Sequence, residues 1–108
     1  MPTWTKIAVA ADCPPGTGRE LIVADRVVAL FNVEGTYLAL DGVCPHQGGP
    51  LGKGRLSGCI VTCPWHGWQF DVRSGQHQLS RRLQQPGFEV RLEGEEIFID
   101  LDGRQGTA

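Results

Sequence analysis

The chain has 108 residues, enough for one domain with a modest core, and its formal net charge is -2. That charge gives no reason to expect nucleic acid or an anionic membrane as a partner. No apolar run approaches the ~20 residues that span a bilayer, and no basic segment precedes the short apolar run at residues 7–11. We therefore expect a soluble, cytoplasmic protein, in which four cysteines favour metal or redox chemistry over disulfides.

Frequent glycines and prolines predict many turns and short strands. Strands are expected at residues 4–10, 20–23, 26–33, 36–40, 58–62, 69–72, 88–92 and 95–101. Turns are expected at Ala24-Asp25, Glu34-Gly35 and Glu93-Gly94. Residues 12–18 and 76–85 are interpreted as loops, and residues 102–108 as a frayed tail. The predicted fold class is all-β, with short antiparallel strands in a single domain over residues 1–108.

Two short groups of potential metal ligands lie in the middle of the sequence. The first is Cys44-Pro45-His46, and the second, sixteen residues after His46, is Cys63-Pro64-Trp65-His66. The glycines between the two groups argue against a helix there. We therefore expect the two groups on two loops, each next to a strand.

Thiolates and imidazoles together suit zinc or an iron–sulfur cluster. Zinc fingers usually pair cysteine with cysteine and histidine with histidine, whereas each group here is mixed. A single residue between Cys44 and His46 is a tight spacing for one tetrahedral metal, and it suits ligands of two different metals. Two alternatives stay open on these grounds: a site for zinc alone, and side chains that are simply packed or exposed without any metal.

The two groups resemble the Rieske [2Fe-2S] motif, C-x-H followed by C-x-x-H, and the similarity covers roughly residues 4 to 101. In that family both cysteines bind one iron and both histidines bind the other. The resemblance implies that Cys44 and Cys63 bind the inner iron, and that His46 and His66 bind the outer iron close to solvent. It further implies one [2Fe-2S] cluster and a Rieske β-sandwich with an inserted cluster-binding lobe at about residues 43–72.

The sequence departs from the respiratory Rieske pattern at four positions. That pattern has two more cysteines, joined as a disulfide, where this chain has Gly49 and Trp65. It also has serine and tyrosine hydroxyl groups, which donate to sulfur, where this chain has Trp68 and Phe70. Fewer donors to sulfur imply a reduction potential at the low end of the Rieske range.

The remaining cysteines and histidine have no ligand spacing. We expect Cys59 to be a buried core residue, Cys13 to lie in a surface loop without an assigned role, and His77 to face the solvent. A non-haem oxygenase site needs two histidines and a carboxylate, which the chain cannot supply once two histidines bind the cluster. The chain is therefore not a complete Rieske oxygenase.

Some residues near the motif have two interpretations each. Trp65 either packs over the cluster or belongs to an apolar docking patch, and Arg81 and Arg82 are either a solvated face or part of a docking site. Backbone amides around residues 47–49 and 65–68 are candidates for hydrogen bonds to the bridging sulfides.

The resemblance implies a one-electron carrier, not itself an enzyme, that accepts an electron from a flavin-dependent reductase and passes it to a terminal oxygenase. One alternative is the small Rieske subunit of an NAD(P)H nitrite reductase, which has a similar length and a similar C-P-H-x-G-G-P-L segment. Another alternative is a regulatory module in which the cluster senses an oxidant.

Overall fold

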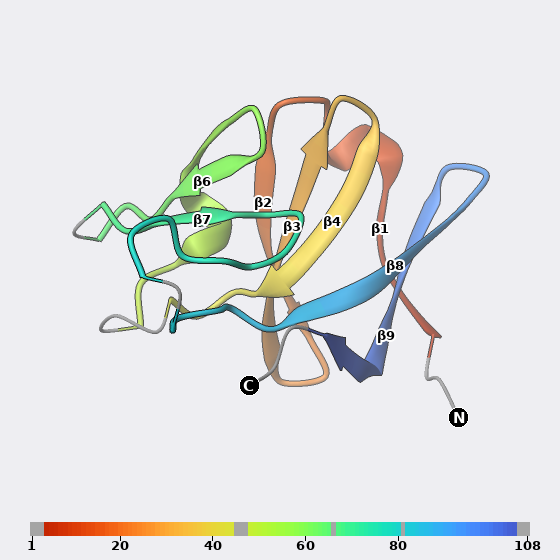
Figure 1. Ribbon diagram of the computed structural model, residues 1–108. Helices are drawn as coiled ribbons and strands as arrows, with labels where there is room; N and C mark the ends of the chain where they lie inside the picture. The colour runs from red at the N-terminus through yellow and green to blue at the C-terminus, as the bar shows by residue number, and fades with distance from the viewer. Residues whose placement is uncertain (1–3, 45–47, 66, 81, 106–108) are drawn as a thin grey trace.

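The computed structural model describes residues 4–44, 48–65, 67–80 and 82–105, the last four of them by their backbone alone. Within these residues, six strands form an antiparallel sheet in the order β1-β9-β8-β4-β3-β2. Their bounds are β1 Trp4–Val9, β2 Gly18–Val23, β3 Arg26–Val33, β4 Thr36–Asp41, β8 Gly87–Glu93 and β9 Glu96–Gln105. A smaller sheet contains β5 Arg55–Ser57, β6 Ile60–Thr62 and β7 Gln69–Asp71 (Figure 1). The predicted all-β class is confirmed.

Two tight hairpins connect β2, β3 and β4, as the sequence predicts. Ala24 and Asp25 both have positive φ values, of 49° and 65°, and Glu34 and Gly35 have φ values of 51° and 95°. Two successive residues with positive φ match the right-handed twist of the strands that they join. The side chain of Asn32 supports the second turn, because its Oδ1 accepts a hydrogen bond of 2.7 Å from the amide of Gly35.

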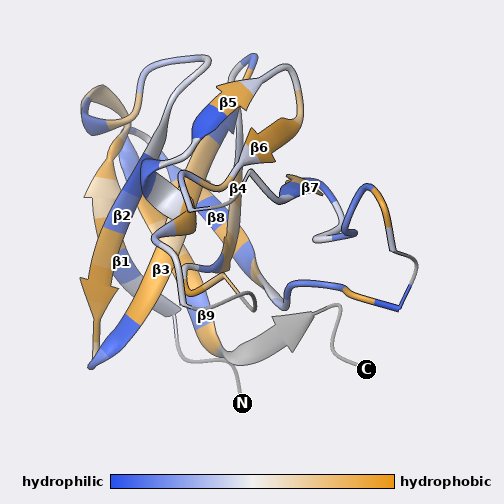
Figure 2. Ribbon diagram, turned by 90° about the vertical axis from the view of Figure 1, so that its left-hand side faces the viewer, coloured by the Kyte–Doolittle hydropathy of each residue, from blue (hydrophilic) through white to orange (hydrophobic). Residues whose placement is uncertain are grey.

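Strand β3 separates two apolar clusters, because its successive side chains point to opposite faces. Val28 and Leu30 belong to the first cluster, and Ala29 and Phe31 belong to the second, with all four fully buried. The first cluster also contains Ala8, Cys13, Val23, Ala39, Phe88, Ile97 and Ile99. The second also contains Leu40, Cys44, Leu51, Val61, Cys63, Phe70 and Val72. Figure 2 shows the apolar residues along β3 and β6.

The second cluster joins the small sheet to the large one. The 3-10 turn η2, Leu51–Lys53, links the sheets by packing on β2 through Gly52. A Cβ at Gly52 would lie 2.7 Å from the carbonyl oxygen of Arg19, so this close approach requires glycine. Leu51 of η2, Val61 of β6 and Phe70 of β7 therefore pack against the face of the large sheet that carries Ala29 and Phe31.

Three predictions about the elements were wrong. Strand β9 continues to Gln105 and pairs with β8 through Phe88↔Arg104 and Gly87↔Gln105, so residues 102–105 are not a frayed tail. Strand β5 was missed because its three residues, Arg55–Ser57, are mostly polar. Residues 58–59 form the turn between β5 and β6, where Gly58 has a φ of 59°, and are not part of a strand.

A second 3-10 turn, η1 Ala10–Asp12, follows β1, so the predicted strand at residues 4–10 ends one residue earlier, at Val9, and the turn reaches the first residue of the predicted loop at residues 12–18. No helix among the described residues is long and apolar enough to cross a membrane.

Candidate metal centre

The first predicted ligand loop leaves the end of β4 and returns to the start of η2. The amide of Cys44 donates a hydrogen bond of 2.9 Å to the carbonyl oxygen of Gly49, and Val43 forms a β-bridge with Pro50. The amide of Gly48 donates to the carbonyl oxygen of Cys44 at 3.0 Å, so this amide is engaged within the loop. Cys44 itself is 1% exposed.

The second predicted ligand loop connects β6 to β7. The amide of Cys63 donates a hydrogen bond of 2.7 Å to the carbonyl oxygen of Trp68, and Thr62 pairs with Gln69 at the base of the loop. Gly67, with a φ of 74°, provides the left-handed conformation that the turn needs. Both loops thus close in the same way, with the cysteine amide bonded to the carbonyl five residues ahead.

The two loops meet at Gly49. A Cβ at this position would lie 2.7 Å from Sγ of Cys63 and 3.0 Å from Cβ of Trp65, so only glycine fits without a shift of the second loop. Cys44 and Cys63 form no disulfide, are both 1% exposed, and are members of one apolar cluster. Positions 49 and 65, which are joined cysteines in the respiratory pattern, are therefore neighbours in this chain as well.

The structure places two of the four predicted ligands. Cys44 and Cys63 lie on adjoining loops, as expected, whereas His46 and His66 lie outside the described residues. In the described part of the chain, no three side chains that commonly bind metals lie together. The described part of the site is thus a pair of buried thiols without a disulfide.

His77 is buried against the second loop, and the prediction that it faces the solvent was wrong. Its ring contacts Trp68 and Phe70 edge to face, with centroid distances of 4.6 and 5.1 Å. Its Nδ1 accepts hydrogen bonds from the amides of Leu79 and Ser80, at 3.0 and 3.1 Å. The residue is 7% exposed, and burial lowers its pKa below the usual value for histidine. No sequence signal distinguished this histidine from an exposed one.

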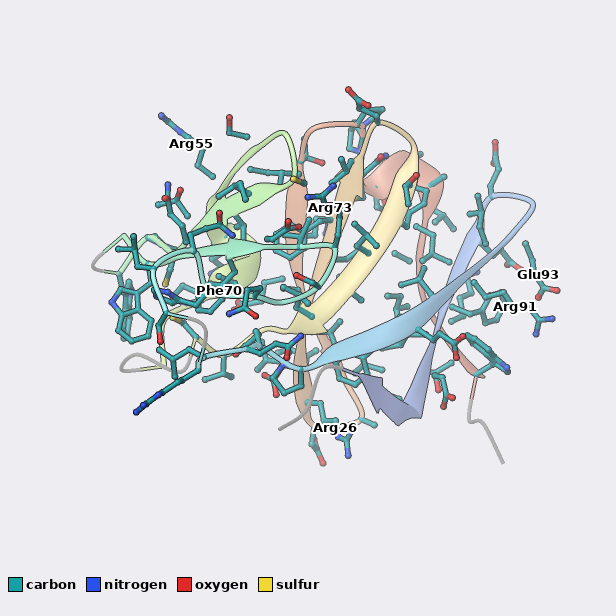
Figure 3. All side chains as sticks on the ribbon, viewed as in Figure 1. Arg26, Arg55, Phe70, Arg73, Arg91 and Glu93 are labelled. Atoms are coloured by element: carbon teal, nitrogen blue, oxygen red, sulfur yellow. The ribbon has the colours of Figure 1, made fainter. Side chains whose placement is uncertain are left out.

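The predicted loop at residues 76–85 is a strap that connects the two ligand loops. At one end, His77 packs on Trp68 and Phe70, and Phe70 points from β7 into the interior (Figure 3). At the other end, the buried side chain of Gln85 donates to the carbonyl oxygens of Asp41 and Val43, at 2.6 and 2.7 Å. A Cβ at Gly75 would overlap the carbonyl oxygen of Gln85, so the start and end of the strap are in close contact.

The side chain of Gln76 holds the strap together internally. Its Nε2 donates to the carbonyl oxygens of Ser80 at 2.9 Å and Leu83 at 3.1 Å. The segment has no regular strand, but isolated bridges join Phe70 to His77 and Gln76 to Gln84. The loop interpretation is correct for the backbone, while the ordered polar contacts were not predicted because they depend on tertiary structure.

Two further features border the first and second loops. Trp65 is 49% exposed, and it therefore presents apolar surface to the solvent beside Gly49.

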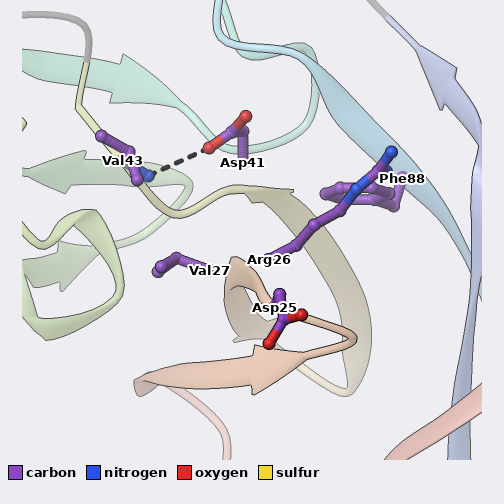
Figure 4. A pocket seen from close by; sticks show the side chains of 6 residues that line it. All are labelled: Asp25, Arg26, Val27, Asp41, Val43 and Phe88. Atoms are coloured by element: carbon purple, nitrogen blue, oxygen red, sulfur yellow. Dashed lines mark hydrogen bonds between the residues drawn. The ribbon is translucent and has the colours of Figure 1, made fainter.

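A shallow pocket of about 230 Å³ lies beside the first loop and is lined by Asp25, Arg26, Val27, Asp41, Val43 and Phe88 (Figure 4). Neither cysteine of the candidate centre lines this pocket, and its lining mixes acidic, basic and apolar groups.

The other two cysteines differ from expectation. Cys13 is fully buried in the first apolar cluster, with its Sγ 3.6 Å from the carbonyl oxygen of Thr17, so it is not a surface residue. Burial raises the pKa of its thiol. Cys59 is only partly buried, because it sits in the β5–β6 turn at the edge of the second cluster. Cys59 was predicted to be a core residue because Ile60 and Val61 follow it in the sequence, and the turn at residues 58–59 was not predicted.

Comparison with known proteins identifies the family. The model of the Rieske [2Fe-2S] domain matches residues 3–98. The chain belongs to the Rieske family. It is 30% identical over 99 residues to the ferredoxin component of the naphthalene 1,2-dioxygenase system of Pseudomonas aeruginosa, a match that covers 91% of this chain and 95% of that protein.

Solved structures of Rieske proteins share the fold. A complex of reduced oxygenase and oxidised ferredoxin in carbazole 1,9a-dioxygenase contains a chain with a TM-score of 0.80 and 30% identity, which covers 90% of this chain and 92% of that chain. A protein described as the small subunit of an NADPH nitrite reductase matches with a TM-score of 0.77 over 90% of this chain and 97% of that chain. Its identity is 19%, so that likeness concerns the fold alone.

The chain is therefore a Rieske electron carrier with a [2Fe-2S] cluster as its cofactor. The described residues fit this cofactor, because thiolates are the protein ligands of iron–sulfur clusters. Two buried cysteines without a disulfide lie on adjoining loops, and glycine at position 49 lets the first loop approach Sγ of Cys63 closely. The sequence left open a site for zinc alone and side chains without any metal, and the family match favours the [2Fe-2S] cluster over both.

Proposed function

We propose that Cys44, His46, Cys63 and His66 bind the cluster, in the pattern of the family. Cys44 and Cys63 would hold the inner iron, since both sulfurs are buried in the second apolar cluster. His46 and His66 would hold the outer iron near the surface. The cluster-binding lobe would comprise about residues 43–72 of a single domain over residues 1–108. When bound, the cluster takes up and releases one electron.

The residues around the cluster would act mainly by holding the ligands in place. The hydrogen bonds from Cys44 to Gly49 and from Cys63 to Trp68 fix the backbone at each cysteine. The second apolar cluster keeps water away from both cysteines, which are 1% exposed and belong to it together with the fully buried Leu51, Val61 and Phe70. Such a shell controls the solvent access and the local dielectric of a metal site, and hence its redox potential.

We further propose that the protein receives its electron from a flavin-dependent reductase and passes it to a terminal oxygenase, and that it is not itself an enzyme. The observation that carries this proposal is the match, over 91% of this chain and 95% of the relative, to a ferredoxin component of a dioxygenase system. The similar chain found in a complex of oxygenase and ferredoxin supports the oxygenase as acceptor.

The ligand assignment can be tested by substitution of each cysteine. Protein purified without oxygen should contain two irons and two sulfides and should absorb visible light, as a [2Fe-2S] protein does. Cys44→Ser and Cys63→Ser should lose most of the iron and the colour, whereas Cys13→Ser and Cys59→Ser should keep both. Retention of the full cluster by either of the first two variants would refute the assignment.

The transfer chain can be tested with components from the native host. NADH and a flavin-dependent reductase should bleach the cluster, and addition of a terminal oxygenase with its aromatic substrate should restore the oxidised spectrum. Substrate oxidation should require the carrier. A reductase that cannot reduce the protein, or an oxygenase that cannot reoxidise it, would contradict the proposal.

A small subunit of an NAD(P)H nitrite reductase is the second candidate, because one such protein has the same fold. Such a subunit is a fixed part of a larger enzyme, so it should purify from the native host together with the large subunit. Purification as a free chain by size-exclusion chromatography would favour the carrier.

A further inference from the structure

The charges of the chain are divided unevenly between its two ends. Residues 44–85, here called the loop region, contain five basic residues and one acidic residue, a formal charge of +4. The rest of the chain contains five basic and eleven acidic residues, a formal charge of -6. The net charge of -2 is thus the sum of a positive loop region and a negative remainder of the chain.

Not all of the basic groups in the loop region are available to a partner. Arg73 is paired with Asp71, the single acidic residue of the region, at 2.7 Å, and Lys53 is paired with Glu20 of β2 at 3.7 Å. Within the described residues, no ion pair involves Arg55 or Arg82, and both residues are exposed. These two guanidinium groups therefore define the positive surface.

Both arginines lie close to the second ligand loop. Arg55 pairs with Thr62 across β5 and β6, and Thr62 directly precedes Cys63. Arg82 lies in the strap, whose His77 packs on Trp68 of the same loop. The two arginines thus come from two separate elements: β5, which pairs with the strand leading into the second loop, and the strap, which packs on that loop through His77.

Exposed apolar side chains belong to the same two elements, the second ligand loop and the strap. Trp65 at the tip of the second loop is 49% exposed, and Leu79 in the strap is 93% exposed. A leucine so exposed contributes almost nothing to the core of its own chain. An apolar centre with charged groups at its edge is the usual composition of a protein–protein interface.

Two exposed acidic residues lie far from the loop region. Glu93 and Glu95 flank the β8–β9 turn at Gly94, and both are exposed. Figure 3 shows Glu93 and Arg55 at opposite ends of the molecule. The positive formal charge of the loop region and the position of these two residues together make the charge distribution of the chain uneven.

We propose that the loop region docks onto an acidic surface of the protein that accepts the electron. This inference rests on the proposed function, since it takes the electron acceptor as the partner. The loop region suits the acceptor because a chain similar to this one occurs in a complex of ferredoxin with oxygenase. Opposite charges would steer the protein so that its cluster end meets the acceptor first, although the net charge is negative.

Small redox reagents of opposite charge test the sign of the local field. The fully reduced protein is mixed with ferricyanide or with hexaamminecobalt(III) over a range of ionic strengths, and the return of the oxidised spectrum is followed by stopped flow. Ferricyanide should react more slowly as salt is added, and the cobalt complex should react faster, because salt screens attraction and repulsion alike. The opposite pair of trends would overturn the inference.

Charge reversal at the two arginines provides the residue-level test. Arg55→Glu/Arg82→Glu should invert both salt trends and should slow ferricyanide by roughly tenfold at low ionic strength. Lys6→Glu/Arg91→Glu, which changes the net charge equally on β1 and β8, outside the loop region, should keep the trends of the natural protein. An equal effect of the two double variants would show that only net charge matters and would contradict the proposal.

The same variants distinguish the two protein partners. Electron transfer to the terminal oxygenase should show a raised KM for the Arg55→Glu/Arg82→Glu carrier, with at least about tenfold lower kcat/KM at low salt. Reduction by the reductase should change less. If only the reductase step is impaired, the assignment to the acceptor is wrong. A loss of the visible spectrum would instead point to a failure of the cluster site and of the proposed function.

Discussion

The ring of His77 stands edge-on to the ring of Trp68, with a centroid distance of 4.6 Å and an interplanar angle of 86°. The two residues come from different segments, the strap and the second ligand loop. The carbonyl oxygen of Trp68 accepts the hydrogen bond from the amide of Cys63. His77 is therefore connected to a proposed iron ligand through one intervening residue.

Two substitutions of His77 should separate its ring contacts from its hydrogen bonds. His77→Asn keeps an acceptor near the amides of Leu79 and Ser80 but removes the ring, whereas His77→Phe keeps a ring and removes the acceptor. His77→Asn should lose about 1 kcal/mol from the aromatic contacts and should also raise the reduction potential, because water gains access near the cluster. Thermal unfolding and redox titration measure the two effects.

His77→Phe should keep the potential of the natural protein while losing about 1 kcal/mol of stability from its two amide partners. Leu79→Ser, at a site that is 93% exposed, should change neither quantity. Equal potentials in the natural protein and in His77→Asn would show that the ring contact has no influence on the cluster.

The low pKa of buried His77 should also make stability depend on pH. The unfolded chain binds a proton near pH 6.5, and the folded protein binds it only at lower pH, so the free energy of unfolding rises with pH between the two values. The contribution is complete above about pH 6.5 and is lost as the pH falls through the folded pKa. Asp71, whose pKa is lowered chiefly by its hydrogen bond with Arg73, acts in a separate window below about pH 4.

Urea unfolding between about pH 5 and pH 8 checks this dependence. Subtraction of the His77→Phe profile isolates the histidine from the other titrating groups. The difference between the two proteins should change as the pH rises towards about 6.5 and then stay constant. A difference that is the same at every pH would mean that His77 titrates alike in the folded and unfolded states.

Gly49→Ala should disrupt the cluster site. Its Cβ would approach Sγ of Cys63, a proposed iron ligand, to 2.7 Å, and binding of iron would leave that sulfur little freedom to move. The variant should contain less iron per chain and should have an altered visible spectrum. Gly58→Ala, at a turn where a Cβ would meet nothing within 4 Å, should lose about 1 kcal/mol because of its positive φ but should keep its iron. Full iron content in Gly49→Ala would disprove the steric argument.

Gln85→Glu should loosen the first ligand loop. The substitution keeps the size of the side chain but replaces the donor to the carbonyl oxygens of Asp41 and Val43 with an acceptor. We expect a loss of about 2 kcal/mol and faster loss of iron to a chelator. The matched control is Gln84→Glu, at an exposed neighbour whose side chain bonds only Ser74 among the described residues. Equal rates of iron loss for the two variants would show that Gln85 does not secure the loop.

The reduction potential should lie at the low end of the Rieske range, about -150 mV. Phe70 is fully buried and has no donor group, and it occupies the position at which the respiratory pattern has a tyrosine hydroxyl. Phe70→Tyr should therefore raise the midpoint, because it restores a donor close to the thiolate. Protein-film voltammetry would measure both values, and a natural midpoint well above 0 mV would refute the expectation.

The sequence predicts much of this structure where the signals are local. The hairpin turns at Ala24-Asp25 and Glu34-Gly35 follow from backbone requirements of two adjacent residues, and strand β3 has the bounds that its apolar run predicts. The sequence also predicts that Cys44 and Cys63 lie on two loops next to strands, and both are buried on adjoining loops, while their binding of one cluster stays a prediction.

The failures concern residues whose environment is created by distant segments. His77 follows a glycine turn in a polar segment and looks exposed, yet Trp68 and Phe70 from another loop enclose it. Cys13 precedes two prolines, yet the first apolar cluster buries it. The extension of β9 depends on partners in β8 that periodicity alone does not reveal.

The shared closure of the two ligand loops has a kinetic consequence. Because the amides of Cys44 and Cys63 are bonded to carbonyl groups of their own loops, each cysteine is fixed before the electron arrives. Preorganised groups need little rearrangement when charge develops beside them. We therefore expect a small reorganisation energy for gain or loss of an electron at the proposed site.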